Sequence, residues 1–303
     1  MDLAQKPGRI GNGALGPLIF LLFLWGQFFL ALMPTWLAFP SYNYAWVALP
    51  LWCFLVFQRW TEIKVPWNFQ SGGRGGFMLA FAVLLLILPL FIIRPLEQVD
   101  QFWRLPIWLH AALVFSVTGL ILVRGFGLKA SKGLLQLSAL ALVLVPMPSV
   151  LEGAIAGNLT RIVTERVADL LPLTGYPIDQ LGNAMLVKGA VLDVAEGCSG
   201  LRSFQASLML GLFLGEFYRL PLVRRVILLG MALLLAMVGN GSRIYYLTTI
   251  AYRDGMEAEA RVHGTAGALV VTFIYGGIGL LAWWFSIWKV GVRRKAGQRR
   301  VSA

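Results

Sequence analysis

The fold is organised around one junction in the sequence, Glu196-Gly197-Cys198-Ser199-Gly200-Leu201-Arg202-Ser203. This junction places a cysteine between two glycines, at the point where a polar segment gives way to a long apolar run. The function depends on which side of a membrane the thiol faces, and on which other side chains can reach it.

The composition indicates that this chain folds in a membrane and not in water. Of its 303 residues, 58% are hydrophobic and only 13% are charged, and the mean hydropathy is +0.74. Water-soluble domains of this length do not have such a composition, whereas chains with several runs of about 20 apolar residues do. We therefore expect an all-α polytopic membrane protein.

Apolar stretches predict about eight transmembrane helices. The first stretch is too long for the apolar region of a cleaved signal peptide and has no clear cleavage site, so it is counted as a helix. With neither an internal repeat nor a low-complexity linker, residues 1–303 are expected to form a single integral membrane domain. The expected spans are residues 15–39, 44–57, 77–93, 106–123, 134–148, 201–217, 222–250 and 264–288.

The distribution of charge predicts how the chain is oriented. The net charge is +12, but the basic residues occur in short clusters between apolar runs, which is typical of topology signals and not of a nucleic-acid-binding face. With a cytoplasmic N-terminus, the five inner segments hold 17 of the 26 Lys and Arg residues and 3 of the 14 Asp and Glu residues. We therefore expect both termini, including the basic tail 289–303, in the cytoplasm, and no nucleic acid as a partner.

The segment 151–197 is the only sizeable part of the chain expected outside the membrane. Residues 154–171 carry apolar side chains at helical spacing with charged ones between them, which predicts an amphipathic helix on the membrane surface. Residues 184–194 contain two short β-prone runs around Lys188-Gly189, which predicts a hairpin leading to Cys198. A disordered outer loop is the alternative interpretation.

The predicted topology brings three reactive side chains to the outer face of the membrane. Cys198 lies at the N-terminal end of the sixth span, Arg243 in the outer part of the seventh, and His263 immediately before the eighth. This arrangement follows from charge counting alone.

Cys198 occupies a position that favours a thiolate. The backbone amides and the macrodipole at a helix N-terminus stabilise an anion, and Gly197 and Gly200 would let a substrate backbone approach closely. A disulfide with Cys53 is not expected, because Cys53 lies in the middle of an apolar run, so Cys198 is expected to be a free thiol. The alternative is a small buried residue at a helix start.

Arg243 is expected below the headgroups on the outer side of the seventh span. An ionisable group at that depth costs about 3 kcal/mol unless it is paired or hydrated, which makes it a functional candidate. Asn240, three residues earlier on the same helix face, could orient it. The alternative is an arginine that snorkels to the outer headgroups.

His263 is one of two histidines. Asp254, Glu257 or Glu259 could set its tautomer through a hydrogen bond, as acid–base chemistry requires, and the spacing does not choose among them. An ordinary loop histidine is the alternative. The other histidine, His110, lies near the outer end of the fourth span and is expected to have a packing or interfacial role.

In combination these motifs resemble those of the exosortase and archaeosortase family. The resemblance is carried by the junction at Glu196–Ser203, by Asn240-Gly241-Ser242-Arg243 in the next span and by His263-Gly264 at the last. The eight-span layout and the β-prone run before the cysteine extend it over most of the chain. One departure is Gly197, which stands where the family usually has alanine, and it leaves the thiol in place.

The resemblance implies a membrane-embedded cysteine protease or transpeptidase. The sequence leaves bacterial and archaeal origins open, and the expected location is a bacterial inner (plasma) membrane with the active site facing the periplasm. Cys198 is then the nucleophile, and Arg243 and His263 complete the catalytic site without a cofactor or metal. The supporting residues are Glu196, Ser199, Arg202 and Asn240.

The expected partners also follow from this resemblance. They are membrane lipids, an acceptor nucleophile that the sequence does not identify, and exported proteins with a C-terminal sorting signal. That signal consists of a short motif such as Pro-Glu-Pro (a PEP-CTERM signal), a hydrophobic helix and a basic cluster. Hydrolysis and transpeptidation would use the same three catalytic residues.

Two other functions stay open at this point. Gly197-Cys198-Ser199-Gly200 also matches the G-x-S-G of rhomboid intramembrane proteases, with Ser199 as nucleophile and His263 as base. That family's Ser and His lie deeper, within helices, and need no arginine. The other alternative is a non-enzymatic transporter or scaffold in which Arg243 binds an anionic solute.

Overall fold

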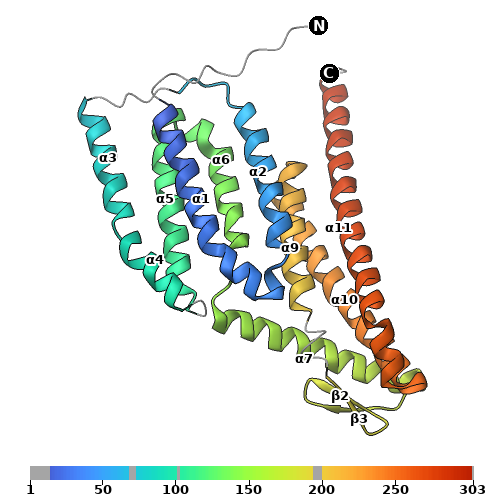
Figure 1. Cartoon of the computed structure of the whole chain (residues 1–303). Helices are drawn as coiled ribbons and strands as arrows, with labels where there is room; N and C mark the ends of the chain where they lie inside the picture. Colours follow the sequence, from blue (N-terminus) through green and yellow to red (C-terminus); the bar gives the residue numbers. More distant parts are fainter. Residues whose placement is uncertain (1–13, 68–72, 101–102, 194–199, 302–303) are drawn as a thin grey trace. The chain divides into compact units, whose positions relative to one another are not determined.

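The computed structural model describes residues 14–67, 73–100, 103–193 and 200–301 (Figure 1). Side chains are described up to Trp288. The chain divides into two compact units, Met1–Ser149 and Val150–Ala303. Both units are mainly helical and several of their helices are long and apolar, so the protein is a polytopic helical membrane protein.

In the part of the first unit that the structure describes, there are six α-helices and two 3-10 turns. Their bounds are α1 Leu15–Ala38, η1 Pro40–Tyr42, α2 Ala45–Thr61, α3 Gly73–Ile87, α4 Leu90–Val99, α5 Leu105–Phe126, α6 Leu128–Leu140 and η2 Ala141–Leu144. Arg104, just before α5, is buried and joins two distant segments. Its Nη1 donates to the Tyr42 hydroxyl at 2.8 Å and to the Met147 carbonyl at 2.7 Å.

His110 is the polar centre of the first unit. It lies on α5, is 1% exposed, and its Nδ1 is 2.9 Å from Oε1 of Glu97 on α4. Glu97 also accepts a hydrogen bond from Arg94 at 3.0 Å, and the Phe28 ring packs edge-on to the imidazole. His110 therefore has a packing role between α4, α5 and α1.

The described residues of the second unit form a long helix, a small sheet and three further helices. Its elements are α7 Ser149–Leu173, β1 Asp179–Leu181, β2 Ala184–Val187, β3 Ala190–Asp193, α9 Leu201–Phe217, α10 Leu222–Asp254 and α11 Met256–Val301. The sheet is antiparallel in the order β1-β2-β3. Strands β2 and β3 form the hairpin of the 184–194 segment, and its two turn residues, Lys188 (φ 49°) and Gly189 (φ 86°), both have the positive φ of a type I′ turn.

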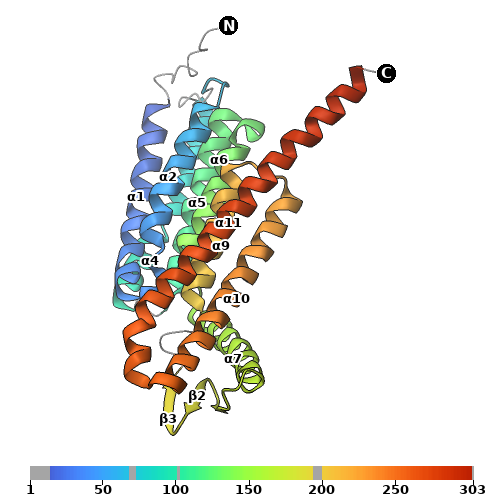
Figure 2. The same cartoon turned by 90° about the vertical axis from the view of Figure 1, so that its right-hand side faces the viewer.

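Helices α9, α10 and α11 lie side by side (Figure 2), and glycines allow them to approach closely. A Cβ added to Gly211 on α9 would lie 3.1 Å from Leu229 of α10, and one added to Gly239 on α10 would lie 2.8 Å from Ile274 of α11. Small residues let membrane helices approach closely enough for van der Waals packing to hold them together. A methyl group at Gly239 would therefore require the side chain of Ile274 on α11 to shift.

Each of the eight stretches expected to span the membrane contains helix, but residues 77–93 are interrupted at Leu88-Pro89 and α6 ends at Leu140 within residues 134–148. Among the described residues, five helical segments are long and apolar enough for a span, or six if the broken pair Leu128–Leu144 and Ser149–Leu173 counts as one. Helices α2 and α9 have 17 residues each, about 25 Å at the rise of an α-helix, which is at the lower end of the range for a span. The total of eight thus stays a prediction.

Candidate active site

The residues predicted for catalysis are only partly covered by the structure. Glu196, Cys198 and Ser199 lie outside the described residues. Arg202, Asn240, Arg243 and His263 are described, and all four belong to the second unit. Arg202 is in the first turn of α9 with an exposed side chain.

The start of α9 contacts the middle of α10 at Gly200. This glycine is the residue before the helix, in the left-handed conformation with φ 72°, and a Cβ added to it would lie 2.8 Å from Nδ2 of Asn240. Asn240 is buried, with 5% of its surface exposed. Glycine is required here both for the backbone conformation and for the close approach of the amide.

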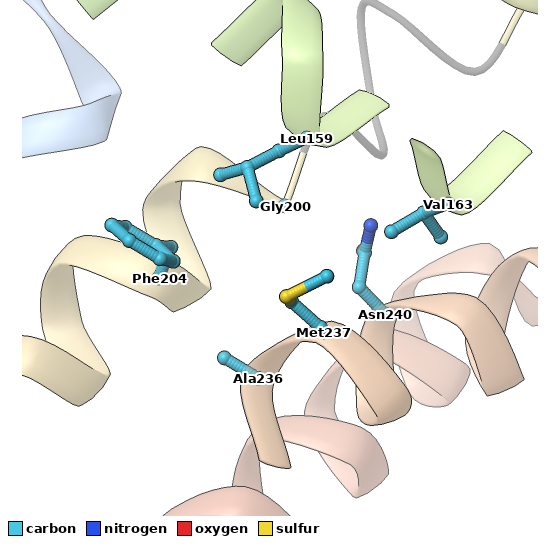
Figure 3. A pocket seen from close by; sticks show the side chains of 7 residues that line it. All are labelled: Leu159, Val163, Gly200, Phe204, Ala236, Met237 and Asn240. Carbon is cyan, nitrogen blue, oxygen red and sulfur yellow. The ribbon is translucent and has the colours of Figure 1, made fainter. Parts of the chain in front are cut away.

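A small pocket opens beside this contact (Figure 3). Met237 and Asn240 project from α10 toward Gly200 and toward α7. The pocket has room for roughly one water molecule. Its lining consists of Leu159, Val163, Gly200, Phe204, Ala236, Met237 and Asn240.

Arg243 lies one helical turn beyond Asn240 and contacts α11. A Cβ added to Gly267 would lie 3.4 Å from Cζ and 3.4 Å from Nη2 of Arg243. The absence of a side chain at Gly267 thus leaves the surface of α11 open to the guanidinium. Gly267 is four residues after His263, so the two lie on the same face of α11.

His263 lies inside a helix, which differs from the position predicted. Helix α11 begins at Met256 and not at Gly264. Gly255, with φ 90°, ends α10, and the residues that follow are mostly good helix formers with Glu257 and Glu259 in the first turn, where acidic side chains are favourable. The polar start of the helix does not resemble a membrane span, so the apolar pattern placed the boundary eight residues too late.

The structure selects one carboxylate for His263. Nδ1 of His263 is 2.7 Å from Oε1 of Glu259, one turn earlier on α11. Glu259 is buried, whereas Glu257 and Asp254 are exposed. The side chain of His263 is 36% exposed, so the imidazole is held at one nitrogen and accessible from solvent.

An apolar cluster supports the corner between α10 and α11. Met185 of β2 is fully buried in it and accepts a hydrogen bond at Sδ from the Thr248 hydroxyl of α10, at 3.2 Å. The partly buried Met256 and Val262 of α11 pack against the same cluster. The sheet therefore fixes the turn of α11 that carries His263, a role that the sequence pattern did not reveal. The buried members are Val163, Val167, Leu171, Met185, Val187, Ile244, Leu247, Ala251 and Ala266.

Arg243 and His263 lie toward the same end of the α10–α11 pair, because Arg243 contacts Gly267 one turn after His263. The other ends of their helices are marked by Arg224, which donates to the Phe285 carbonyl at 3.0 Å and lies over the Trp288 ring. Arg243 is 19 residues from Arg224, and His263 is 25 residues from Trp288. These separations are about 29 Å and 38 Å along an α-helix, close to or above the roughly 30 Å of a hydrocarbon core.

We predict that Gly200→Ala lowers the stability of the protein to thermal unfolding more than a glycine-to-alanine substitution at another left-handed position does. The left-handed backbone alone costs a side chain about 1–2 kcal/mol, and the added methyl also meets Asn240. Gly175→Ala is the matched control, because Gly175 has φ 90° with open space around it. Thermal unfolding in detergent should show a larger loss for Gly200→Ala, and equal losses would mean that the contact with Asn240 is unimportant.

Comparison with known proteins gives one match. A family model described as transmembrane exosortase matches residues 36–288, which is most of the chain and includes every residue of the site. No curated protein and no solved structure matches this chain.

Proposed function

Because the chain belongs to the transmembrane exosortase family, we propose that it processes exported proteins carrying a C-terminal sorting signal, by cysteine-dependent cleavage or transpeptidation. The family acts generally as a membrane protease or transpeptidase on proteins with sorting signals. To this general activity the proposal adds three assignments. Cys198 is the nucleophile, Arg243 and His263 assist it, and the reaction takes place at the outer face of the membrane.

One series of contacts carries the proposal. Gly200 contacts Asn240, Arg243 lies one turn further along α10 and contacts Gly267, and Gly267 follows His263 by one turn of α11. Cys198 precedes Gly200 by two residues, so the chain holds their Cα atoms within about 7.6 Å of each other. This supports a site in which the thiol of Cys198, the guanidinium of Arg243 and the imidazole of His263 meet.

In the first half of the proposed reaction, the thiolate of Cys198 attacks the scissile carbonyl carbon of the substrate. The tetrahedral intermediate collapses to a thioester as the carbon–nitrogen bond breaks, and the imidazolium of His263 gives its proton to the departing amine. In the second half, neutral His263 takes a proton from water or an acceptor amine, which attacks the thioester and releases the Cys198 thiolate. Every proton lost by His263 in the first half is regained in the second.

We assign to Arg243 the stabilisation of the negative charge that develops on the substrate during the reaction. The guanidinium is always protonated and carries several fixed donors. It is partly buried, and the proposal places it at the outer boundary of the membrane, where solvent screens a charge less than in bulk water. A fixed cation in such a place stabilises the oxyanion of the tetrahedral intermediate, with no reorganisation at the moment of reaction.

The location of the site agrees with the sorting signal proposed for the substrate. A hydrophobic helix that ends in a basic cluster would span the same membrane with its basic end in the cytoplasm. The short motif before the helix would then emerge at the outer boundary, beside Cys198. This assignment includes eight spans, a periplasmic active site in a bacterial inner membrane, and an amphipathic α7 on the outer surface.

Trapping of the thioester tests the proposal directly. In a Cys53→Ser background Cys198 is the only thiol, because the chain has two cysteines. Incubation with a sorting-signal substrate should give a covalent adduct that hydroxylamine releases as the substrate hydroxamate, whereas the same protein with Cys198→Ala should give none. If no hydroxylamine-sensitive adduct forms with a substrate that is nevertheless cleaved, the thioester mechanism is wrong.

A further inference from the structure

We propose that Glu259 is the positioning residue of the reaction, and that it fixes the tautomer and the orientation of His263. This inference rests on the function proposed above, because it assigns His263 to proton transfer. Glu259 acts through the imidazole and has no contact with the substrate, so it is distinct from the three catalytic residues.

The hydrogen bond determines which nitrogen is available. An ionised carboxylate only accepts hydrogen bonds, so Nδ1 of His263, at 2.7 Å from Glu259, carries the proton in the neutral imidazole. Nε2 is then the nitrogen with a lone pair, and it is the atom that can take a proton from an incoming nucleophile. When the imidazole is protonated, the same carboxylate stabilises the positive charge.

Glu259 is itself held in place from two sides. Its backbone N–H donates to the Gly255 carbonyl at 3.2 Å, in the first turn of α11. Its side chain is 8% exposed, in a turn whose neighbours Met256 and Val262 pack on the apolar cluster around Met185. The carboxylate therefore has little freedom to move, and the imidazole one turn later is fixed with it.

The same geometry rules out equivalent roles for the other two acidic residues. Asp254 is the last residue of α10 and Glu257 lies in the first turn of α11, and both are exposed. Glu257 and Glu259 differ by two positions on the helix, which puts their side chains on different faces. Glu257→Gln is thus a matched control, since it removes the same charge from the same turn.

Steady-state kinetics give the first test. Glu259→Ala should lower kcat by about 10- to 100-fold with KM within about twofold, because positioning of the imidazole affects the chemical steps and not substrate binding. Glu259→Gln should fall between Glu259→Ala and the wild type, because its amide oxygen still accepts from Nδ1 but carries no charge. Glu257→Gln should stay within about twofold of wild-type kcat. A Glu259→Ala protein that matches the Glu257→Gln control would overturn the proposal.

Nitrogen NMR on protein labelled with 15N-histidine gives a second test that does not require activity. The chain has two histidines, so the signals absent from His263→Gln belong to His263. In the wild type, His263 should show a protonated Nδ1 and an unprotonated Nε2, and in Glu259→Ala the proton should move largely to Nε2. An unchanged tautomer in Glu259→Ala would refute the positioning role.

The two tests separate this inference from the proposed function. If Cys198→Ala retains cleavage, the proposed cysteine mechanism fails, while the NMR experiment still decides whether Glu259 sets the tautomer of His263. If Cys198→Ala is inactive and the tautomer is the same with and without Glu259, the mechanism stands and the positioning role is wrong.

Discussion

Substitution of Cys198 by alanine should abolish cleavage of a sorting-signal substrate, whereas Ser199→Ala should leave cleavage near the wild-type level. The expected loss is at least about 10⁴-fold in kcat, because a reaction that proceeds through a covalent intermediate cannot start without its nucleophile. Cleavage would be followed by the appearance of the shortened substrate in proteoliposomes, with equal amounts of each variant.

This pair of variants also decides between two classes of protease. The neighbouring residues Cys198 and Ser199 are both chemically capable nucleophiles, so each serves as the control for the other. An inactive Ser199→Ala protein and an active Cys198→Ala protein would identify a serine protease of the rhomboid type. Both variants should unfold in detergent at temperatures close to that of the wild type, which would show that a loss of cleavage does not come from misfolding.

Arg243→Ala should lower kcat by about 10²- to 10³-fold, the usual cost of removing a donor that stabilises an oxyanion. Arg243→Lys should recover part of the activity, since it restores the charge without the planar, multiple donors of the guanidinium. In single-turnover experiments, formation of the thioester should be slowed along with its breakdown, because both halves of the reaction pass through a tetrahedral oxyanion.

Arg253→Ala is the matched control for Arg243. Arg253 is an exposed arginine on the same helix, in the last turn of α10, so its loss should leave kcat within about twofold. The non-enzymatic alternative makes the opposite prediction for the cysteine: a transporter or scaffold that binds an anion through Arg243 is impaired by Arg243→Ala and unaffected by Cys198→Ala. Loss of cleavage in Cys198→Ala as well as in Arg243→Ala excludes this alternative.

Apolar runs allowed most of the helices to be predicted from the sequence. The interiors of α1, α5 and α10 follow directly from their hydrophobicity, because a membrane requires every backbone polar group to be bonded within the segment. The break between α3 and α4 was not predicted, since residues 77–93 read as one continuous apolar run. Pro89, at the start of α4, is the residue that explains it.

The sequence allowed us to propose which residues form the candidate site, but not which of them are in contact. The choice of Glu259 depends on His263 being inside a helix, and that helix begins with polar residues that the hydropathy pattern assigns to a loop. The contacts of Gly200 with Asn240 and of Gly267 with Arg243 depend on the packing of separate helices, which no local pattern encodes. The meeting of Cys198 with Arg243 and His263 stays a prediction, and so does the single-domain organisation.

The short strand β1 was also missed. It is three residues long and exposed along its length, so it has none of the alternation that identifies a half-buried strand. Strands β2 and β3 were predictable, because two β-prone runs flank Lys188-Gly189. Their contribution to the site became clear only from the burial of Met185 against α10.

The connection between α10 and α11 has a consequence for biogenesis. A single residue, Gly255, separates the two helices, so no loop is available to let them enter the bilayer independently. We therefore expect them to insert as one helical hairpin, in which the charge of Arg243 enters the bilayer with Gly267 of α11 already alongside it. On this expectation, the corner that carries Arg243 and His263 is assembled during membrane insertion and not after it.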